Sequence, residues 1–326
     1  MKSGIFWVLS FILSVAAADQ ARKSRVAIIT GGTRGIGRGI TEALADSGHY
    51  QGFLLTYNTN KQAAESFVSE LKERFAANND ECAFNIQLVG GDISLEKTRD
   101  TIFHCLDKKF GDWELGALVH NAGQYVGITS DNAARLGKNQ ELVFGDGSLL
   151  LGDGKEKVNL EVMRYYQRMY GEAYVDLCER ALERMRRAAE NYNGNIKFRG
   201  SLIGISSPGC NFSQRPSLGY DMPGSGKTVM EYAMRLYAVR AAAIGCINSN
   251  VVVPGVTETE AWSRLEASNG MDAGSIFESV KKRSPMGESL TPRDIGDVVA
   301  FLSGDQGGRF ITGVSSQVDA GLHLKM

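Results

Sequence analysis

The chain has 326 residues, of which 36 are Lys or Arg and 37 are Asp or Glu, so its formal net charge is −1. A hydrophobic content of 43% is enough for a folded core, which excludes a disordered chain. The balanced charge favours neither nucleic acid nor an acidic membrane as the main partner, and indicates small neutral or weakly charged ligands instead.

Residues 1–18 have the composition of a targeting segment. Lys2 precedes an apolar stretch at 5–15, and Ala16, Ala17 and Ala18 form a small-residue cleavage pattern. The apolar stretch is shorter than the roughly 20 residues that a membrane-spanning helix needs. We therefore predict a signal peptide that directs the chain into the secretory pathway, to the ER or to an organelle reached through it, such as a complex plastid. The alternative is an uncleaved leader that anchors the protein in a membrane.

From residue 19 onward, short β-branched runs alternate with stretches of helical character. In chain order we predict strand 25–30, helix 37–47, strand 52–57, helix 61–76, strand 85–89, helix 95–110, strand 117–120, helix 160–191, strand 201–205, helix 227–244, strand 250–253, helix 292–302 and strand 315–319. This alternation is typical of a doubly wound parallel sheet with helices on both faces, a Rossmann-like three-layer α/β/α fold. We expect a single domain at 19–326. Asp-Gly turn signals at 146–147 and 153–154 indicate an irregular, hairpin-like insertion at about 124–157 near the ligand site.

The first predicted strand runs directly into TGGTRGIG, Thr30 to Gly37, which opens the first helix. Glycines at such a turn let the backbone approach a pyrophosphate, whose charge meets the N–H groups of the helix N-terminus. The spacing Gly31-x-x-x-Gly35-x-Gly37 resembles that of the short-chain dehydrogenase/reductase family. The resemblance continues in order through Asp92-Ile93, Asn121-Ala122-Gly123, Ser207, Tyr220, Lys227, PGVTET at 254–259 and ITG…VDAG at 311–321.

This resemblance implies a nicotinamide dinucleotide cofactor. Asp92 would hydrogen-bond near the adenine ring, the segment 121–123 would line the cofactor behind the fourth strand, and the segment 254–259 would hold the nicotinamide carboxamide. The cofactor-binding residues expected on this basis are Gly31, Thr33, Arg34, Gly35, Ile36, Gly37, Asn58, Asp92, Ile93, Asn121, Ala122, Gly123, Tyr220, Lys227, Pro254, Gly255, Thr257 and Thr259.

The end of the second strand predicts which form of the cofactor is used. An acid there would bind the ribose 2′-hydroxyl of NAD, whereas a base would accept the 2′-phosphate of NADP. The segment Leu55-Thr56-Tyr57-Asn58 contains no acid, and Arg34 stands in the glycine turn. The sequence therefore favours NADP(H).

Ser207, Tyr220 and Lys227 resemble the catalytic trio of this family. A phenol with an ordinary pKa of about 10 needs a nearby cation to transfer protons near neutrality, and Lys227 and the oxidised nicotinamide would supply that charge. Ser207 would hydrogen-bond the substrate oxygen. Ser206 is the alternative, but the interval from Ser207 to Tyr220 matches the family. The sequon that begins at Asn211 lies between them, where a glycan would crowd the site, which argues against a mature ER-lumen enzyme.

The trio departs from the common pattern in one interval. Six residues separate Tyr220 from Lys227, where the family usually has three. The longer spacing resembles the enoyl-acyl-carrier-protein reductases, whereas the glycine motif and Ser207 resemble 3-oxoacyl-acyl-carrier-protein-type ketoreductases. Pro223 and Gly224 indicate that the helix starts after Tyr220, so we expect this tyrosine in a loop that can fold back.

A further family residue, an Asn in the fourth helix, has two candidate positions here. Asn159 fits the local pattern KVNL, whereas alignment through Ala181-Leu182 places Tyr170 at that position. Both candidates stay open.

The sequence GSGKT at 224–228 is the tail of a phosphate-binding P-loop. The full motif needs a Gly where Asp221 stands, and no strand directly precedes the segment. We therefore reject nucleotide hydrolysis.

We predict an NADPH-dependent reductase of a ketone or 3-oxoacyl-like carbonyl. The alternatives are an enoyl reductase and a non-catalytic NADP(H)-binding sensor or scaffold. Expected partners are a small carbonyl or acyl-thioester substrate and further copies of the chain in a homodimer or homotetramer, without nucleic acid. The cysteines, which stand singly, predict buried thiols and no metal site: Cys82, Cys105, Cys178, Cys210 and Cys246.

Overall fold

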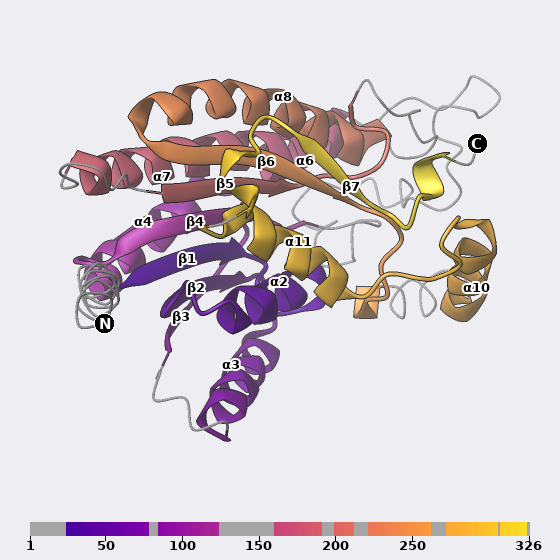
Figure 1. The fold of residues 1–326 in the computed structure, drawn as a ribbon, viewed down its shortest axis with the longest axis horizontal. Helices are drawn as coiled ribbons and strands as arrows, with labels where there is room; N and C mark the ends of the chain where they lie inside the picture. The colour runs from indigo at the N-terminus through magenta and orange to yellow at the C-terminus, as the bar shows by residue number, and fades with distance from the viewer. Residues whose placement is uncertain are drawn as a thin grey trace, which may run out of the picture.

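The computed structural model describes residues 24–77, 84–123, 160–190, 199–211, 221–261, 272–305 and 307–324. A single sheet of parallel strands forms its centre (Figure 1). The strands are β1 (Arg25–Thr30), β2 (Gly52–Tyr57), β3 (Asn85–Gly90), β4 (Glu114–His120), β5 (Arg199–Ile205), β6 (Cys246–Pro254) and β7 (Ser315–Val318). Their order in space is β3-β2-β1-β4-β5-β6-β7. The connections therefore reverse direction between β1 and β4, the place where ligands bind in doubly wound folds.

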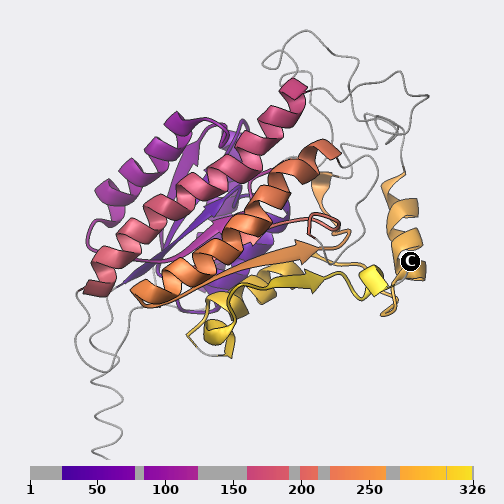
Figure 2. The ribbon, with the colours of Figure 1, turned by 90° about the horizontal axis from the view of Figure 1, so that it is seen from above.

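Helices cover both faces of the sheet. The α-helices are α2 (Gly35–Asp46), α3 (Lys61–Ala77), α4 (Glu96–Phe110), α6 (Leu160–Tyr166), α7 (Ala173–Glu190), α8 (Asp221–Ile244), α10 (Ala273–Arg283) and α11 (Pro292–Ser303). Shorter elements are the π-helix η2 (Gln167–Glu172) and the 3-10 helices η3 (Gly307–Phe310) and η4 (Leu322–Leu324). Seen from above, α4, α7 and α8 lie side by side over one face (Figure 2), while α2, α3 and α11 cover the other.

The alternation of side chains along β1 divides the core into two layers. Val26 and Ile28 belong to the cluster beneath α4, α7 and α8, whereas Ala27 and Ile29 belong to the cluster beneath α2 and α11. Successive residues of a strand point to opposite faces, so a strand covered on both sides reads as a continuous apolar run. This explains why RVAIIT is buried along its whole length.

The predicted parallel α/β sheet is confirmed, but several boundaries differ from the prediction. Helix α8 begins at Asp221, six residues before the predicted start at 227. Pro223 lies in its first turn, where a backbone N–H has no partner within the helix, so the N–H that proline lacks is not missed. The predicted helix at 160–191 is interrupted by η2, and α10 was not predicted. The predicted leader at 1–18, the insertion at 124–157, Asn159 and Tyr220 lie outside the described residues.

Four of the cysteines can be placed, and all four are free thiols. Cys178 and Cys210 are buried, and Cys105 and Cys246 are half-buried, whereas Cys82 lies outside the described residues.

Within the described part of the chain, no group of His, Cys, Asp and Glu is arranged to hold a metal ion. No helix there is both long and apolar enough to cross a bilayer.

Candidate active site

The glycine turn lies between β1 and α2, at the carboxyl edge of the sheet. Gly31 and Gly35 have φ values of 64° and 51°, which favour glycine. A Cβ on Gly37 would lie 2.0 Å from the carbonyl oxygen of Gly31, and one on Gly31 would lie 3.0 Å from the Cα of Ala122. A side chain therefore does not fit at Gly37, and one at Gly31 would be both crowded and strained. Arg34, at the N-cap of α2, is exposed and its side chain does not cap the helix.

This turn fits the pyrophosphate of a dinucleotide. Its glycines carry no side chains that would keep a phosphate from the backbone, and the first N–H groups of α2 provide partial positive charge at the same place. Half-buried Ile36 and buried Thr33 continue the turn into the helix.

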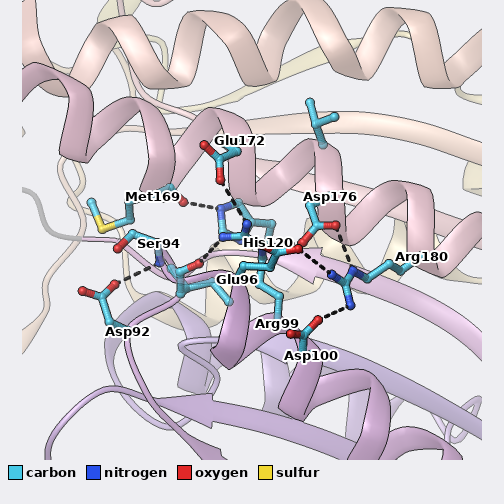
Figure 3. Close-up of polar contacts among 12 residues, drawn as sticks. Asp92, Ser94, Glu96, Arg99, Asp100, His120, Met169, Glu172, Asp176 and Arg180 are labelled. Atoms are coloured by element: carbon cyan, nitrogen blue, oxygen red, sulfur yellow. Dashed lines mark hydrogen bonds and ion pairs between the residues drawn. The ribbon is translucent and has the colours of Figure 1, made fainter.

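A hydrogen-bond network joins β1 to β4 directly beside this turn. The Thr30 hydroxyl oxygen lies 3.0 Å from His120 Nδ1, and it accepts the backbone N–H groups of Asn121 at 3.0 Å and Ala122 at 2.9 Å. His120 Nε2 lies 3.0 Å from the carbonyl oxygen of Met169 in η2 (Figure 3). A carbonyl only accepts, so Nε2 carries the proton, and the Thr30 hydroxyl donates its own hydrogen to Nδ1.

His120 is held in its neutral form. Burial lowers the pKa of its imidazole to about 3, and the positive charges of Lys227 and Arg99 act in the same direction. Because the ring is fully buried and bonded through both nitrogens, it fixes the distance between β1, β4 and η2. The segment Asn121-Ala122-Gly123 is thereby held against the glycine turn, where the Asn121 amide donates to the carbonyl oxygen of Gly31 at 3.2 Å.

Asp92 and Ile93 follow β3, and both form hydrogen bonds to residues close by in the sequence. The Asp92 carboxylate accepts the backbone N–H of Ser94 at 2.9 Å, and the carbonyl oxygen of Ile93 accepts the Arg99 guanidinium at 3.0 Å. Arg99 is buried and also forms ion pairs with Glu172 and Asp176, so that α4 is joined to η2 and α7 (Figure 3). Both predicted adenine-side residues are thus buried and rigidly placed at the sheet edge.

The predicted residues after β2 and β6 reach the same edge. Asn58 is exposed just beyond β2, and Pro254 ends β6. Thr257 is buried, and its hydroxyl donates to the carbonyl oxygen of Gly255 at 3.0 Å. A Cβ on Gly35 would lie 3.6 Å from Thr259 Cγ2, so the segment after β6 returns to the glycine turn.

Two members of the predicted trio can be placed: Ser207 just after the end of β5, and Lys227 in α8. Ser206 is 2% exposed, with a hydroxyl that has no hydrogen-bond partner among the described residues, whereas Ser207 is half-buried. The more accessible Ser207 is the better placed of the two to meet a substrate. Tyr220 directly precedes the first residue of α8, but it lies outside the described residues, so its role stays a prediction.

Lys227 lies in the second turn of α8 and points at the end of β5. Its ammonium donates to the carbonyl oxygens of Ile205 at 2.9 Å and Ser206 at 3.2 Å. Burial lowers the pKa of Lys227 to about 8. Pro223 occupies the position four residues before Lys227, where the commoner spacing would place the phenol on the same helical face.

Gly226 of GSGKT lies where two helices cross, opposite Gly171. A Cβ on Gly226 would lie 2.4 Å from the carbonyl oxygen of Tyr166, and one on Gly171 would lie 2.9 Å from Val229 Cβ. Close approach of α8 and η2 therefore requires both glycines. The same approach brings Lys227 Nζ to 4.6 Å from the centre of the Tyr170 ring. This placement agrees with the rejection of a P-loop.

Asn211 of the predicted sequon can also be placed. Its side chain is half-buried, and its amide nitrogen donates to the carboxylate of buried Glu231 at 3.4 Å. A glycan would be attached at that same nitrogen, so this contact disfavours modification in the folded chain. Phe212 and Ser213 lie outside the described residues.

Sequence reasoning missed Thr30 and His120 as functional residues. Both carry a usable signal, because Thr30 opens the glycine motif and His120 directly precedes Asn121-Ala122-Gly123. The Met169 carbonyl oxygen could not be found in this way, since it is available only because η2 breaks the α-helical pattern.

Comparisons with known proteins agree with this geometry. Residues 25–142 match the family model described as short chain dehydrogenase, and residues 172–323 match the one described as Enoyl-(Acyl carrier protein) reductase. The chain is similar to the diacetyl reductase, (S)-acetoin forming, of Staphylococcus epidermidis, with 24% identity over 92% of this chain and 98% of that protein. It is also similar to the 3-oxoacyl-acyl-carrier-protein reductase FabG of Haemophilus influenzae, with 27% identity over 93% of this chain and 99% of that protein.

Solved structures share the fold. The crystal structure of YwfH, an NADPH dependent reductase involved in bacilysin biosynthesis, aligns with a TM-score of 0.70 and 20% identity, over 93% of this chain and 100% of that one. The L-sorbose reductase of Gluconobacter frateurii, complexed with NADPH and L-sorbose, aligns with a TM-score of 0.69 and 19% identity, over 94% of this chain and 98% of that one. At these identities the likeness shows the fold alone.

Proposed function

The chain belongs to the short-chain dehydrogenase/reductase family, and from that premise we propose that it is an NADPH-dependent reductase of a ketone or 3-oxoacyl-like carbonyl. The observation that carries this proposal is the position of Lys227, whose ammonium lies at the end of β5 immediately before Ser207. The glycine turn and the segments after β3, β4 and β6 reach the same edge of the sheet. This common edge supports a site in which a dinucleotide and proton-handling groups would meet.

NADP(H) is supported by the charges at the glycine turn. Arg34 is exposed at the N-cap of α2, and β2 ends in Tyr57 followed by exposed Asn58, with no acid to repel a 2′-phosphate. The two solved relatives reported above are described with NADPH in their titles. A guanidinium pairs with a phosphate through parallel hydrogen bonds, which favours the phosphorylated cofactor.

The chain's own residues would handle the proton. When bound, NADPH would supply a hydride from the C4 of its nicotinamide. The Ser207 hydroxyl would donate a hydrogen bond to the substrate oxygen and so stabilise the negative charge that develops there. Tyr220, which precedes α8 in the sequence, would donate the proton to that oxygen, and the Lys227 ammonium would lower the pKa of its phenol.

The central experiment is an NADPH-oxidation assay of the chain without its leader, over a panel of ketones, 3-oxoacyl thioesters and 2-enoyl thioesters. We expect turnover of ketones or 3-oxoacyl thioesters. Tyr220→Phe should lower kcat by about 10² to 10⁴ with little change in NADPH affinity, because general acid catalysis contributes that much. Full turnover in Tyr220→Phe would remove the acid assignment.

Enoyl reduction is the second candidate. Two observations favour it: the family model matched by residues 172–323 bears that description, and six residues separate Tyr220 from Lys227. Turnover of the 2-enoyl thioesters alone would establish this candidate. NADPH binding without oxidation on any substrate of the panel would instead support a sensor or scaffold.

An exposed apolar stripe on α8 supports assembly into a homodimer or homotetramer. Val229, Tyr232, Leu236 and Val239 are 43%, 66%, 48% and 74% exposed, and their spacing places them along one helical face. A surface of this kind favours a symmetric contact between two copies. Light scattering at micromolar concentration should give a dimer or tetramer, and Leu236→Glu should reduce that mass. A monomeric wild-type chain would contradict the proposal.

Entry into the secretory pathway is proposed from the leader sequence alone. Residues 1–24 fused to a fluorescent reporter should direct it to the ER or to an organelle reached through it. A reporter that stays in the cytosol would exclude this localisation, and a reporter that stays uncleaved in membranes would identify an anchor.

A further inference from the structure

Lys227 has an environment that the proposed mechanism does not explain. Its ammonium makes two hydrogen bonds to carbonyl oxygens and lies over the face of the Tyr170 ring, 4.6 Å from the ring centre. Within the described part of the chain these are its contacts, and none of them is a carboxylate. A buried ammonium loses the stabilisation of water, so the protein must provide it by other means.

The Tyr170 ring is held rigidly in this position. Tyr170 is 2% exposed, and its ring stacks on that of Tyr166 with centroids 5.8 Å apart and planes 10° apart. On another side, a Cβ on Gly123 would lie 2.4 Å from the ring, so the chain after β4 approaches it closely. The ring is therefore confined, and its face is presented to the Lys227 ammonium.

The geometry of this contact comes from the backbone. The π-helical segment η2 carries Tyr170, and the carbonyl oxygen of Met169 in the same segment accepts the His120 imidazole. Gly226 lets α8 cross η2 so closely that a Cβ there would lie 3.1 Å from Tyr170 Cβ. Two separate constraints thus place the ring opposite the ammonium.

Four titratable groups act on Lys227 from the elements packed around it. Tyr170 comes from η2, Cys210 from the chain after β5, Glu231 from α8 and neutral His120 from the end of β4. Glu231 carries the one carboxylate among them, and it accepts hydrogen bonds from Ser315 and Asn211. The Lys227 charge is thus favoured at longer range by Glu231 and Cys210, and in direct contact by the face of the Tyr170 ring and the two carbonyl oxygens.

We propose that Tyr170 is a positioning residue for the reaction, and that the face of its ring, not its hydroxyl, keeps the Lys227 ammonium charged and fixed at the end of β5. The aromatic quadrupole attracts a cation placed over the ring centre, and the attraction is strongest where water is excluded. This inference rests on the proposed function, because it assigns the ring a role through Lys227.

The test compares Tyr170→Phe with Tyr170→Leu. The pKa of Lys227 is measured by NMR, from the pH dependence of the side-chain carbon shifts in protein labelled with 13C-lysine. Lys227→Arg identifies the signal. The second value is the pH at which kcat/KM, measured with NADPH, falls on the alkaline side of its pH profile. Tyr170→Phe should leave both values near those of the wild type. Tyr170→Leu should lower the Lys227 pKa by about one unit and move the alkaline limb to lower pH by a similar amount.

Tyr174→Leu is the matched control for loss of packing. Tyr174 is buried in α7, one turn beyond Tyr170, and its ring contacts His120 and Tyr237. This variant should lose a similar amount of unfolding free energy while the Lys227 pKa stays unchanged. A lowered pKa in Tyr174→Leu as large as in Tyr170→Leu would show a packing effect and overturn the proposal.

Two other outcomes would also overturn it. An unchanged Lys227 pKa in Tyr170→Leu would remove the role of the ring, and a loss of activity in Tyr170→Phe with an unchanged Lys227 pKa would assign the role to the hydroxyl. The 13C measurement needs no turnover. If the wild type does not oxidise NADPH, the proposed function fails, yet the Lys227 pKa can still be compared between the wild type and Tyr170→Leu.

Discussion

Two segments of this chain resemble phosphate-binding loops, and the structure uses them differently. TGGTRGIG at 30–37 joins a strand to a helix, with glycines at positive φ and an exposed Arg34. GSGKT at 224–228 lies inside the first turns of α8, where Gly226 meets the backbone of another helix. The first segment lies at the edge of the sheet with an exposed cation, whereas the second packs against another helix with its cation buried.

The two cations of these segments show the same difference. Arg34 is exposed at a helix N-terminus, where an anion is stabilised by backbone N–H groups. Lys227 is 7% exposed and its donors already bind carbonyl oxygens of the chain. A glycine-rich pattern therefore predicts a phosphate site only where a strand leads into it, since the strand end places the loop at the sheet edge.

The largest effect is expected for Gly37→Ala. The new Cβ would lie 2.0 Å from the carbonyl oxygen of Gly31, which is backbone and cannot move aside. We expect a loss of about 3 kcal/mol or more in unfolding free energy and no measurable NADPH binding. Denaturant unfolding and a fluorescence titration measure these quantities. Gly48→Ala is the control: at its φ of 68° nothing lies within 4 Å, so a loss of only about 1 kcal/mol is expected.

The second prediction concerns the histidine that supports the first segment. His120 has a pKa of about 3 in the folded chain, below its ordinary value near 6.5, so the unfolded chain binds a proton that the folded chain does not. The free energy of unfolding should therefore fall by up to about 1.4 kcal/mol per unit as pH drops from 6.5 toward 5.

His120→Gln provides the comparison for this pH dependence. It should be less stable than the wild type at pH 8, because it loses the bonds to Thr30 and Met169, but its stability should fall less steeply between pH 6.5 and 5. Equal slopes in the two proteins would show that His120 does not titrate as described.

Gly226→Ala probes the second segment. Its Cβ would lie 2.4 Å from the carbonyl oxygen of Tyr166, the last residue of α6, so α8 must move away from α6. Overpacking of this kind costs about 1 to 3 kcal/mol. Because the glycine turn is untouched, NADPH affinity should fall less than in Gly37→Ala. Equal losses of affinity would mean that the two segments are not independent.

The smallest effect is expected for Arg34→Ala. Removal of an exposed guanidinium should weaken NADPH binding by about threefold to tenfold and leave NADH binding unchanged. Arg38→Ala is the matched control, because Arg38 lies one turn further along α2 and pairs with Glu42 and Glu70. A uniform loss for both cofactors in Arg34→Ala would instead show that Arg34 only shapes the turn.

Most of the fold could be predicted from local patterns. β-Branched runs such as RVAIIT and their alternation with helical stretches indicate a parallel sheet, because such strands are buried on both faces. Boundaries were less predictable: α8 starts at Asp221 although Pro223 and Gly224 suggested a later start. Proline is tolerated in a first turn, so its presence alone does not mark where a helix begins.

The sequence by itself determined the glycine turn, the order of the motifs and the candidates Ser207 and Lys227, because each depends on neighbours along the chain. Only the tertiary structure decided that Ser206 is buried while Ser207 is half-buried, that Gly226 serves a helix crossing, and that the Tyr170 ring faces Lys227. These properties arise between elements far apart in sequence, where a π-helical turn and two glycines set distances that no local pattern contains.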